Sequence, residues 1–226
     1  EDTIGMESNI QNVLGSASPH TLDIATAYAT FASQGTRRDT HIVSSVANNS
    51  GSVSYTPSTD GDKVFDDGVM ADSTYAMQQV VNSGSGDTAR SLGRPIAAKT
   101  GSSSDNKSAQ FVGYTPQIAT AVTLYQTGED GSEESITPWG EYDEITGSTY
   151  PADIFTEYMQ TALKDLPVED FPDRTAESYQ RGSLNGTSMP VEDDYAPAPQ
   201  PQPTQRQAPV PTTAPQPRTE EPDDEQ

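Results

Sequence analysis

Cysteine is absent from the 226 residues, and histidine occurs only at His20 and His41. The chain therefore has no disulfide, no thiolate metal site and no cysteine nucleophile. Neither histidine belongs to a short metal-binding pattern such as H-E-x-x-H, and we interpret both as structural or exposed. A G-x-S-x-G elbow and a glycine-rich phosphate loop are also missing. We expect no metal ion and no cofactor.

Basic residues are scarce, because 12 lysines and arginines stand against 34 acidic residues, for a net charge of −22. Binding to nucleic acid needs clustered positive charge, so we expect no nucleic-acid partner. No apolar run approaches the roughly 20 residues of a membrane-spanning helix. Since the sequence starts at Glu1 in the middle of a pattern, we expect it to be part of a longer protein.

Proline divides the chain into two regions. Ten of the 18 prolines fall in the last 37 residues, from Pro190 onward. A stretch of this composition cannot bury enough apolar surface to offset the entropy lost on ordering. We predict a folded domain over 1–174 and a disordered, Pro-rich acidic tail over 175–226 with polyproline II character. A solvated tail is favoured over a spacer or a ligand for a proline-binding groove.

Three helices are indicated in the folded region. Ser18 and Pro19 suit the start of the first helix, and Gly35 suits its end. The second is expected from about Asp72 to Asn82, and Pro151 opens the third. Apolar spacing places Leu22, Ala25, Ala29 and Ala32 on one face of the first helix, with Ile24, Tyr28 and Phe31 beside it. In the third helix the expected inward residues are Ile154, Phe155, Tyr158, Met159, Ala162 and Leu163.

Three short apolar runs, at 95–100, 110–114 and 118–125, are typical of β-strands. Only short polar turns separate them, which predicts an antiparallel meander. The order of two helices, three strands and a helix indicates an α+β fold, with helices flanking an antiparallel sheet.

An acidic segment, 129–144, follows the strands. Carboxylates are the ligands of calcium, but the spacing matches no EF-hand loop, so a solvated insertion is favoured. Trp139 lies in this segment, and the sequence leaves open whether it packs against the domain or guides a substrate.

The sharpest chemical signal is Lys99-Thr100-Gly101, at the end of the first predicted strand. The tripeptide alone is short enough to occur by chance, and its surroundings make it specific. Those surroundings are Leu22 to Ala32, Thr88-Ala89, Arg94-Pro95, Phe111 to Pro116, Ala119 to Val122 and Gly147 to Phe155. In this order the segments resemble the C-terminal part of the transpeptidase domain of class A penicillin-binding proteins, whose signature includes S-x-x-K, S-x-N and K-T-G.

The resemblance covers residues 1–174 and implies part of a serine β-lactamase/penicillin-binding transpeptidase-like fold. It implies a peptidoglycan D,D-transpeptidase that cross-links stem peptides through a serine acyl-enzyme and is acylated by β-lactam antibiotics. It also implies an upstream glycosyltransferase domain and a location on the extracytoplasmic face of the bacterial cell membrane, anchored by an upstream segment. The tail is similar in composition to those of actinobacterial members.

Two alternatives stay open. One is a β-lactamase or D,D-carboxypeptidase of the same superfamily, and the other is a non-enzymatic cell-surface module.

The resemblance also implies roles for the residues of the K-T-G strand. Lys99 would place a cation near the substrate carboxylate, and the backbone N–H of Ser102 would form half of an oxyanion hole. Substrate contacts are implied for Thr100, Gly101, Ser102 and Ser103. Ala98 and Ser102 replace the glycine and threonine usual in the family, and neither change alters the role expected of the strand.

The nucleophile is expected outside this chain. Ser104-Asp105-Asn106-Lys107 matches both S-x-x-K and S-x-N by letter. It follows Gly101 closely and falls in a predicted turn between strands, where no helix can present Ser104 and Lys107 one turn apart. We therefore expect S-x-x-K and S-x-N in an upstream part of the same protein, and this fragment alone to be inactive.

Overall fold

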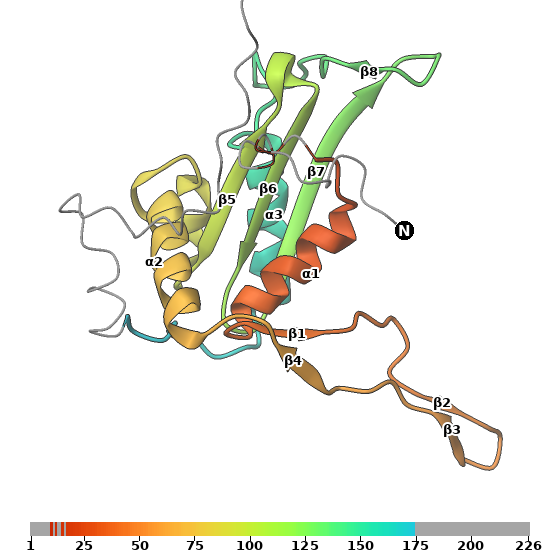
Figure 1. Cartoon of the computed structure of the whole chain (residues 1–226). Coiled ribbons are helices and arrows are strands. Elements are labelled where there is room, and N and C mark those ends of the chain that lie inside the picture. The colour runs from red at the N-terminus through yellow and green to blue at the C-terminus, as the bar shows by residue number, and fades with distance from the viewer. Residues whose placement is uncertain (1–9, 11, 13–14, 16, 175–226) are drawn as a thin grey trace, which may run out of the picture. The chain divides into compact units, whose positions relative to one another are not determined.

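A four-stranded antiparallel sheet forms the centre of the structure, a computed structural model that describes residues 10, 12, 15 and 17–174. The strands pair in the order β5-β6-β7-β8 (Figure 1). They are β5 (Ala97–Ser102), β6 (Ser108–Tyr114), β7 (Ala119–Thr127) and β8 (Glu133–Glu134). β5, β6 and β7 form the predicted meander, and both connections are short. The predicted tail, 175–226, lies outside the described residues.

Helices cover both faces of this sheet. They are α1 (Thr21–Ala32), α2 (Asp67–Ser83) and α3 (Tyr150–Ala162). Figure 1 shows α1 in front of the sheet and α3 behind it, with α2 alongside β5. The short 3-10 helix η2 (Asp87–Leu92) connects α2 to β5. The predicted α+β class, with helices flanking an antiparallel sheet, is confirmed.

Each face of the sheet has its own apolar cluster. On the α3 face, Phe155 packs on Phe111 with ring centroids 4.7 Å apart. On the α1 face, Tyr28 packs edge-on against Tyr114, with centroids 6.1 Å apart. Burial of such aromatic area is the main stabilising contribution in a layered fold. Because side chains alternate along β5, Ala97 faces the α1 cluster and Ala98 faces the α3 cluster.

The helix ends follow local chemistry. Gly35 ends the turn after α1 as predicted: its φ is +82°, and its N–H donates to the Thr30 carbonyl at 2.8 Å. A side chain there would collide with the backbone of Phe65, so glycine is required. Pro151 lies in the first turn of α3, also as predicted. α2, in contrast, begins at Asp67, five residues before the predicted start.

Two of the predicted inward faces are partly wrong. Leu22 is 63% exposed, and Ala29 is exposed too. The face of α1 that packs on the sheet is centred instead on the larger side chains of Tyr28 and Phe31, which the spacing places beside the predicted face. In α3, Ile154 is 43% exposed and Tyr158 is 56% exposed. At 100° per residue, helical spacing turns both side chains away from the buried Ala152, Phe155 and Met159, so the sheet does not cover them.

The segment between α1 and α2 forms an arm that the sequence did not reveal. β1 (Thr36–Arg38) pairs with β4 (Gly61–Lys63), and β2 (Val46–Ala47) pairs with β3 (Val53–Tyr55). Figure 1 shows the arm extending away from the central sheet. Its strands are only two or three residues long, too short for the alternation over at least four positions by which a strand is predicted, and nearly all of their residues are exposed.

Candidate active site

The K-T-G strand is β5, at one edge of the central sheet. β6 pairs with it on one side, with Lys99 opposite Val112 and Ser102 opposite Ala109. On its other side, the described residues supply no further strand. The predicted site residues are grouped along this edge. Lys99, Ser102 and Ser103 are exposed, whereas Thr100 and Gly101 are half-buried.

Backbone hydrogen bonding determines which amide groups point to the open edge. The N–H of Ser103 donates to the carbonyl of Ser108, the first residue of β6, at 3.0 Å. Successive N–H groups along a strand point to opposite sides, so the N–H of Ser102 points away from β6. The same alternation directs the N–H and carbonyl of Thr100 to the open edge. A ligand with an extended backbone can therefore pair there as an added strand.

The Lys99 ammonium lies at this edge as well. Its Nζ donates to the carbonyl oxygen of Thr100 at 2.6 Å. Among the ion pairs of the described residues, none involves Lys99. An exposed lysine without a carboxylate partner can attract an anionic group of a ligand.

Residues distant in sequence hold the two hydroxyl groups of the strand. Thr100 Oγ1 and Ser85 Oγ are 2.7 Å apart and share a hydrogen bond. Ser102 Oγ accepts a hydrogen bond from the N–H of Gly147 at 3.0 Å. Ser85 lies two residues after the end of α2, and Gly147 lies in the loop before α3. Sequence reasoning did not assign either residue to the site, because no local pattern links positions 15 and 45 residues apart.

Ser104 lies in the turn predicted for it, between β5 and β6. Ser104–Asn106 forms one short 3-10 turn, η3, in which Asp105 has φ +58° and Asn106 has φ +52°. Such left-handed residues interrupt a helix. Ser104 and Lys107 therefore do not lie on successive turns of an α-helix.

The histidines lie away from this edge. His20 is the N-cap residue of α1, and His41 is exposed in the connection from β1 to β2. Within the residues described, no three His, Asp or Glu side chains gather in a group that could hold a metal ion. In the acidic segment, Trp139 stacks on Tyr150 with ring centroids 4.8 Å apart and stays 47% exposed. Trp139 therefore packs against the start of α3.

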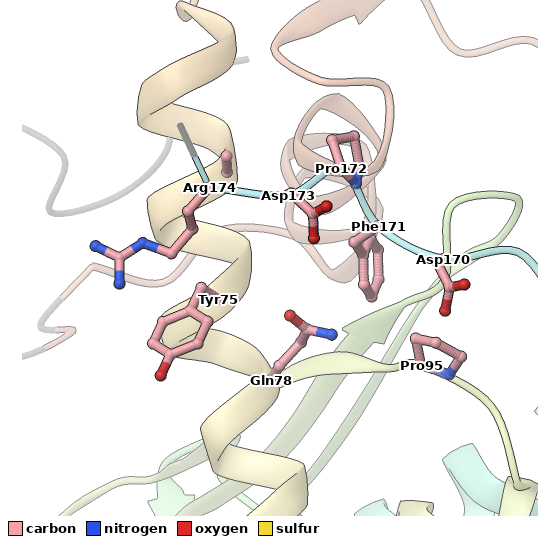
Figure 2. Close-up of a pocket in the computed structure, with 9 residues that line it drawn as sticks. Tyr75, Gln78, Pro95, Asp170, Phe171, Pro172, Asp173 and Arg174 are labelled. Atoms are coloured by element: carbon pink, nitrogen blue, oxygen red, sulfur yellow. The ribbon is translucent and has the colours of Figure 1, made fainter. Parts of the chain in front are cut away.

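A hollow of about 320 Å³ lies apart from the K-T-G residues, between α2 and the segment 170–174. Figure 2 shows Tyr75 and Gln78 of α2 on one side and Phe171 on the other. Phe171 is buried and packs edge-on against Tyr114, with centroids 5.5 Å apart. Arg174 lies over the Tyr75 ring at 4.7 Å. These contacts fasten the segment after α3 to α2 and to the sheet.

The fold and the edge-strand motif resemble those of penicillin-binding transpeptidase domains. The chain belongs to the family described as "Penicillin binding protein transpeptidase domain", which matches residues 15–141. It is 38% identical over 182 residues to Penicillin-binding protein 1A of Mycolicibacterium smegmatis, covering 77% of this chain and 22% of the relative. Penicillin-binding protein 1A of Mycobacterium tuberculosis is 36% identical over 183 residues, with the same two coverages. The chain thus spans about a fifth of the length of these relatives.

Solved structures are also similar to this chain. The PonA1 protein from Mycobacterium tuberculosis, solved in complex with penicillin V, is 33% identical with a TM-score of 0.61. The match covers 74% of this chain and 44% of that one. Penicillin-Binding Protein 1A from Haemophilus influenzae is 19% identical with a TM-score of 0.60. That match covers 72% of this chain and 29% of the other chain, and at this identity it supports only the similarity of fold. In the described residues, no helix is long and apolar enough to cross a membrane.

Proposed function

We propose that this chain supplies the K-T-G strand of a peptidoglycan D,D-transpeptidase, which cross-links stem peptides and is acylated by β-lactam antibiotics. The observation that carries the proposal is the position of Lys99 to Ser103 on the open edge of β5. A serine outside this chain attacks the penultimate carbonyl of the stem peptide, and terminal D-alanine leaves with the proton taken from the serine. An amine of a second stem peptide then attacks the acyl-enzyme, forms the cross-link and releases the serine.

Each residue of the strand has a distinct role in this proposal. The Lys99 cation attracts the substrate carboxylate and assists proton transfer, while hydroxyl groups of Thr100 and Ser102 hydrogen-bond that carboxylate. The N–H of Ser102 stabilises the oxyanion of the tetrahedral intermediate, a contribution of roughly 3–4 kcal/mol in comparable sites. Gly101 carries no side chain, so the substrate backbone can approach the strand there.

The rest of the site comes from elsewhere in the same protein. The β7 edge supports this part of the proposal, because β8 pairs with β7 only at Gln126 and Thr127. The remaining edge, 119–125, carries no charge or proline that would protect it from pairing. Ile154 and Tyr158 of α3, which packs on β7, are exposed as well. We propose that an upstream part of the protein adds strands there and brings the S-x-x-K serine and the S-x-N motif to β5.

The same proposal covers the organisation of the complete protein. Residues 1–174 form the C-terminal part of the transpeptidase domain, and 175–226 form a separate Pro-rich tail. A glycosyltransferase domain and a membrane anchor lie upstream, so that the enzyme works on the extracytoplasmic face of the cell membrane. The relatives named Penicillin-binding protein 1A, several times longer than this chain, support this arrangement.

Acylation by labelled penicillin tests the proposal in the longer protein. Replacing Lys99 by alanine should lower the acylation rate at least about a hundredfold, the loss typical of a removed transition-state donor. Lys164→Ala is the matched control, because Lys164 is an exposed lysine after α3. Near-normal labelling of folded Lys99→Ala protein would contradict the role of Lys99.

Two further measurements separate the alternatives. A transpeptidase gives cross-linked stem peptides, whereas a carboxypeptidase or β-lactamase releases hydrolysed product, and a non-enzymatic module gives neither. The 226-residue chain alone should form no penicillin adduct. An acyl group found on Ser104 by mass spectrometry would show that the nucleophile lies within this chain.

A further inference from the structure

Gly147 makes an unusually close backbone contact with the K-T-G strand. Its N–H donates to Ser102 Oγ at 3.0 Å. A Cβ at this position would lie 2.7 Å from the Gly101 carbonyl oxygen and 2.8 Å from the Gly101 nitrogen, and nearer still to the carbonyl oxygen of Gln110. All three atoms belong to the backbone of β5 or β6, so no side chain can rotate away to make room. Only glycine fits between this loop and the strand.

The contact is on the face of β5 opposite Lys99. Side chains alternate along a strand, so Ser102 and Thr100 share one face while Lys99 and Gly101 share the other. Because Gly147 reaches Ser102 Oγ, the loop 145–149 supports the strand from the Ser102 face. It leaves the Lys99 face and the open edge accessible to a ligand.

The loop itself is firmly held, so a collision would move the strand. Ile145 is fully buried beside Ala109. Thr149 Oγ1 accepts from the Thr146 N–H at 3.0 Å and donates to the Thr146 carbonyl at 2.9 Å, which closes the loop on itself. Tyr142 donates to Asp153 Oδ2 at 2.8 Å, which ties the preceding segment to α3.

The bond from Gly147 also orients the Ser102 hydroxyl. A hydroxyl oxygen that accepts an N–H keeps its own proton available for donation in another direction. We infer that Gly147 is a positioning residue: it holds Ser102 so that the backbone N–H and the hydroxyl proton of Ser102 are both available to a ligand carboxylate or oxyanion. This inference rests on the proposed function and adds a residue to its machinery.

The test compares penicillin with its methyl ester as acylating agents of the longer protein. The Ser102 hydroxyl and the Lys99 cation recognise the carboxylate, so the wild-type protein should react faster with the free acid. Gly147→Ala should lower the acylation rate for the acid about tenfold or more, since small displacements of a binding group are costly. It should also reduce the ratio of the acid rate to the ester rate. A loss of folded protein alone would lower both rates equally and leave that ratio unchanged.

Further variants keep the result interpretable. Gly68→Ala is the control, because Gly68 has open space around it and lies in α2. Thr149→Val loosens the loop without adding an atom at Gly147, and it replaces Gly147→Ala if that variant does not fold. It should lower the acid-to-ester ratio in the same direction. Ser102→Ala should lower the ratio, and adding Gly147→Ala to it should cause little further change in the ratio.

The outcomes separate this inference from the proposed function. If the wild-type protein is not acylated at all, the proposed function fails. If the wild-type protein is acylated, but the folded loop variants keep the wild-type ratio, Gly147 has no positioning role and the proposed function stands. A ratio that falls with the loop variants and not with Gly68→Ala supports the inference.

Discussion

The buried hydroxyl pair of Thr74 and Tyr114 connects α2 to the central sheet. The two oxygens are 2.8 Å apart, and both side chains are almost fully buried. Tyr114→Phe removes one hydroxyl and leaves Thr74 Oγ1 without this partner, which should cost about 1–3 kcal/mol of unfolding free energy. Thr74→Val should cost a similar amount for the same reason.

The double variant distinguishes this hydrogen bond from packing. When apolar groups of the same shape replace both partners, no polar atom stays buried without a partner, and stability should return close to the wild-type value. Equilibrium urea unfolding of the chain can be followed by fluorescence, because Trp139 is its single tryptophan. The reasoning is refuted if Tyr114→Phe changes stability by less than about 0.3 kcal/mol, or if the double variant shows the sum of the single losses.

The burial of Tyr114 should also make the stability of the protein depend on pH in alkaline solution. Burial raises the pKa of Tyr114 to about 12, against the hydrogen bond to Thr74, which lowers it. A raised pKa means that the folded state favours the neutral phenol. This contribution to stability is therefore complete below pH 10 and is lost as the pH rises through 12. Tyr114→Phe should show a weaker fall in stability over that range.

Three other predictions concern packing and ionisation. Phe171→Ala should lower the urea midpoint by the equivalent of about 3 kcal/mol, because a buried ring is removed. An unchanged midpoint would mean that the segment 170–174 contributes nothing to the stability of the domain. Gly113→Ala places a Cβ 2.9 Å from Phe155 Cζ, so unfolding free energy should fall by about 1–3 kcal/mol, and a gain would contradict the crowding. The hydrogen bond to Asp153 raises the pKa of Tyr142 to about 12. In an ultraviolet titration, Tyr142→Phe should therefore show one fewer tyrosine ionising near pH 12 than the wild-type protein.

The central meander could be predicted from the sequence because its determinants are local. Short apolar runs separated by polar turns leave few alternatives to antiparallel pairing, and β5, β6 and β7 form as expected. The same pattern placed Lys99 to Ser103 at the end of the first of these strands. The turn at Ser104 was predictable for the same reason.

Other features depended on what surrounds each element. Apolar spacing marked Ile154 and Tyr158 as inward, yet a helix of this pattern buries only the residues that a neighbouring layer covers. The strands of the exposed arm between α1 and α2 are only two or three residues long, too short to show a detectable alternation, so they were not predicted. Burial is a property of the neighbours as well as of the side chain.

The sequence by itself determined the family motif, the meander and the residues that line the open edge of β5, since each is written in consecutive positions. Only the tertiary structure decided how that edge is supported. Ser85 reaches Thr100 from the loop after α2, and Gly147 reaches Ser102 from the loop before α3. These contacts join segments that meet only when the helices pack on the sheet, so no spacing along the chain encodes them.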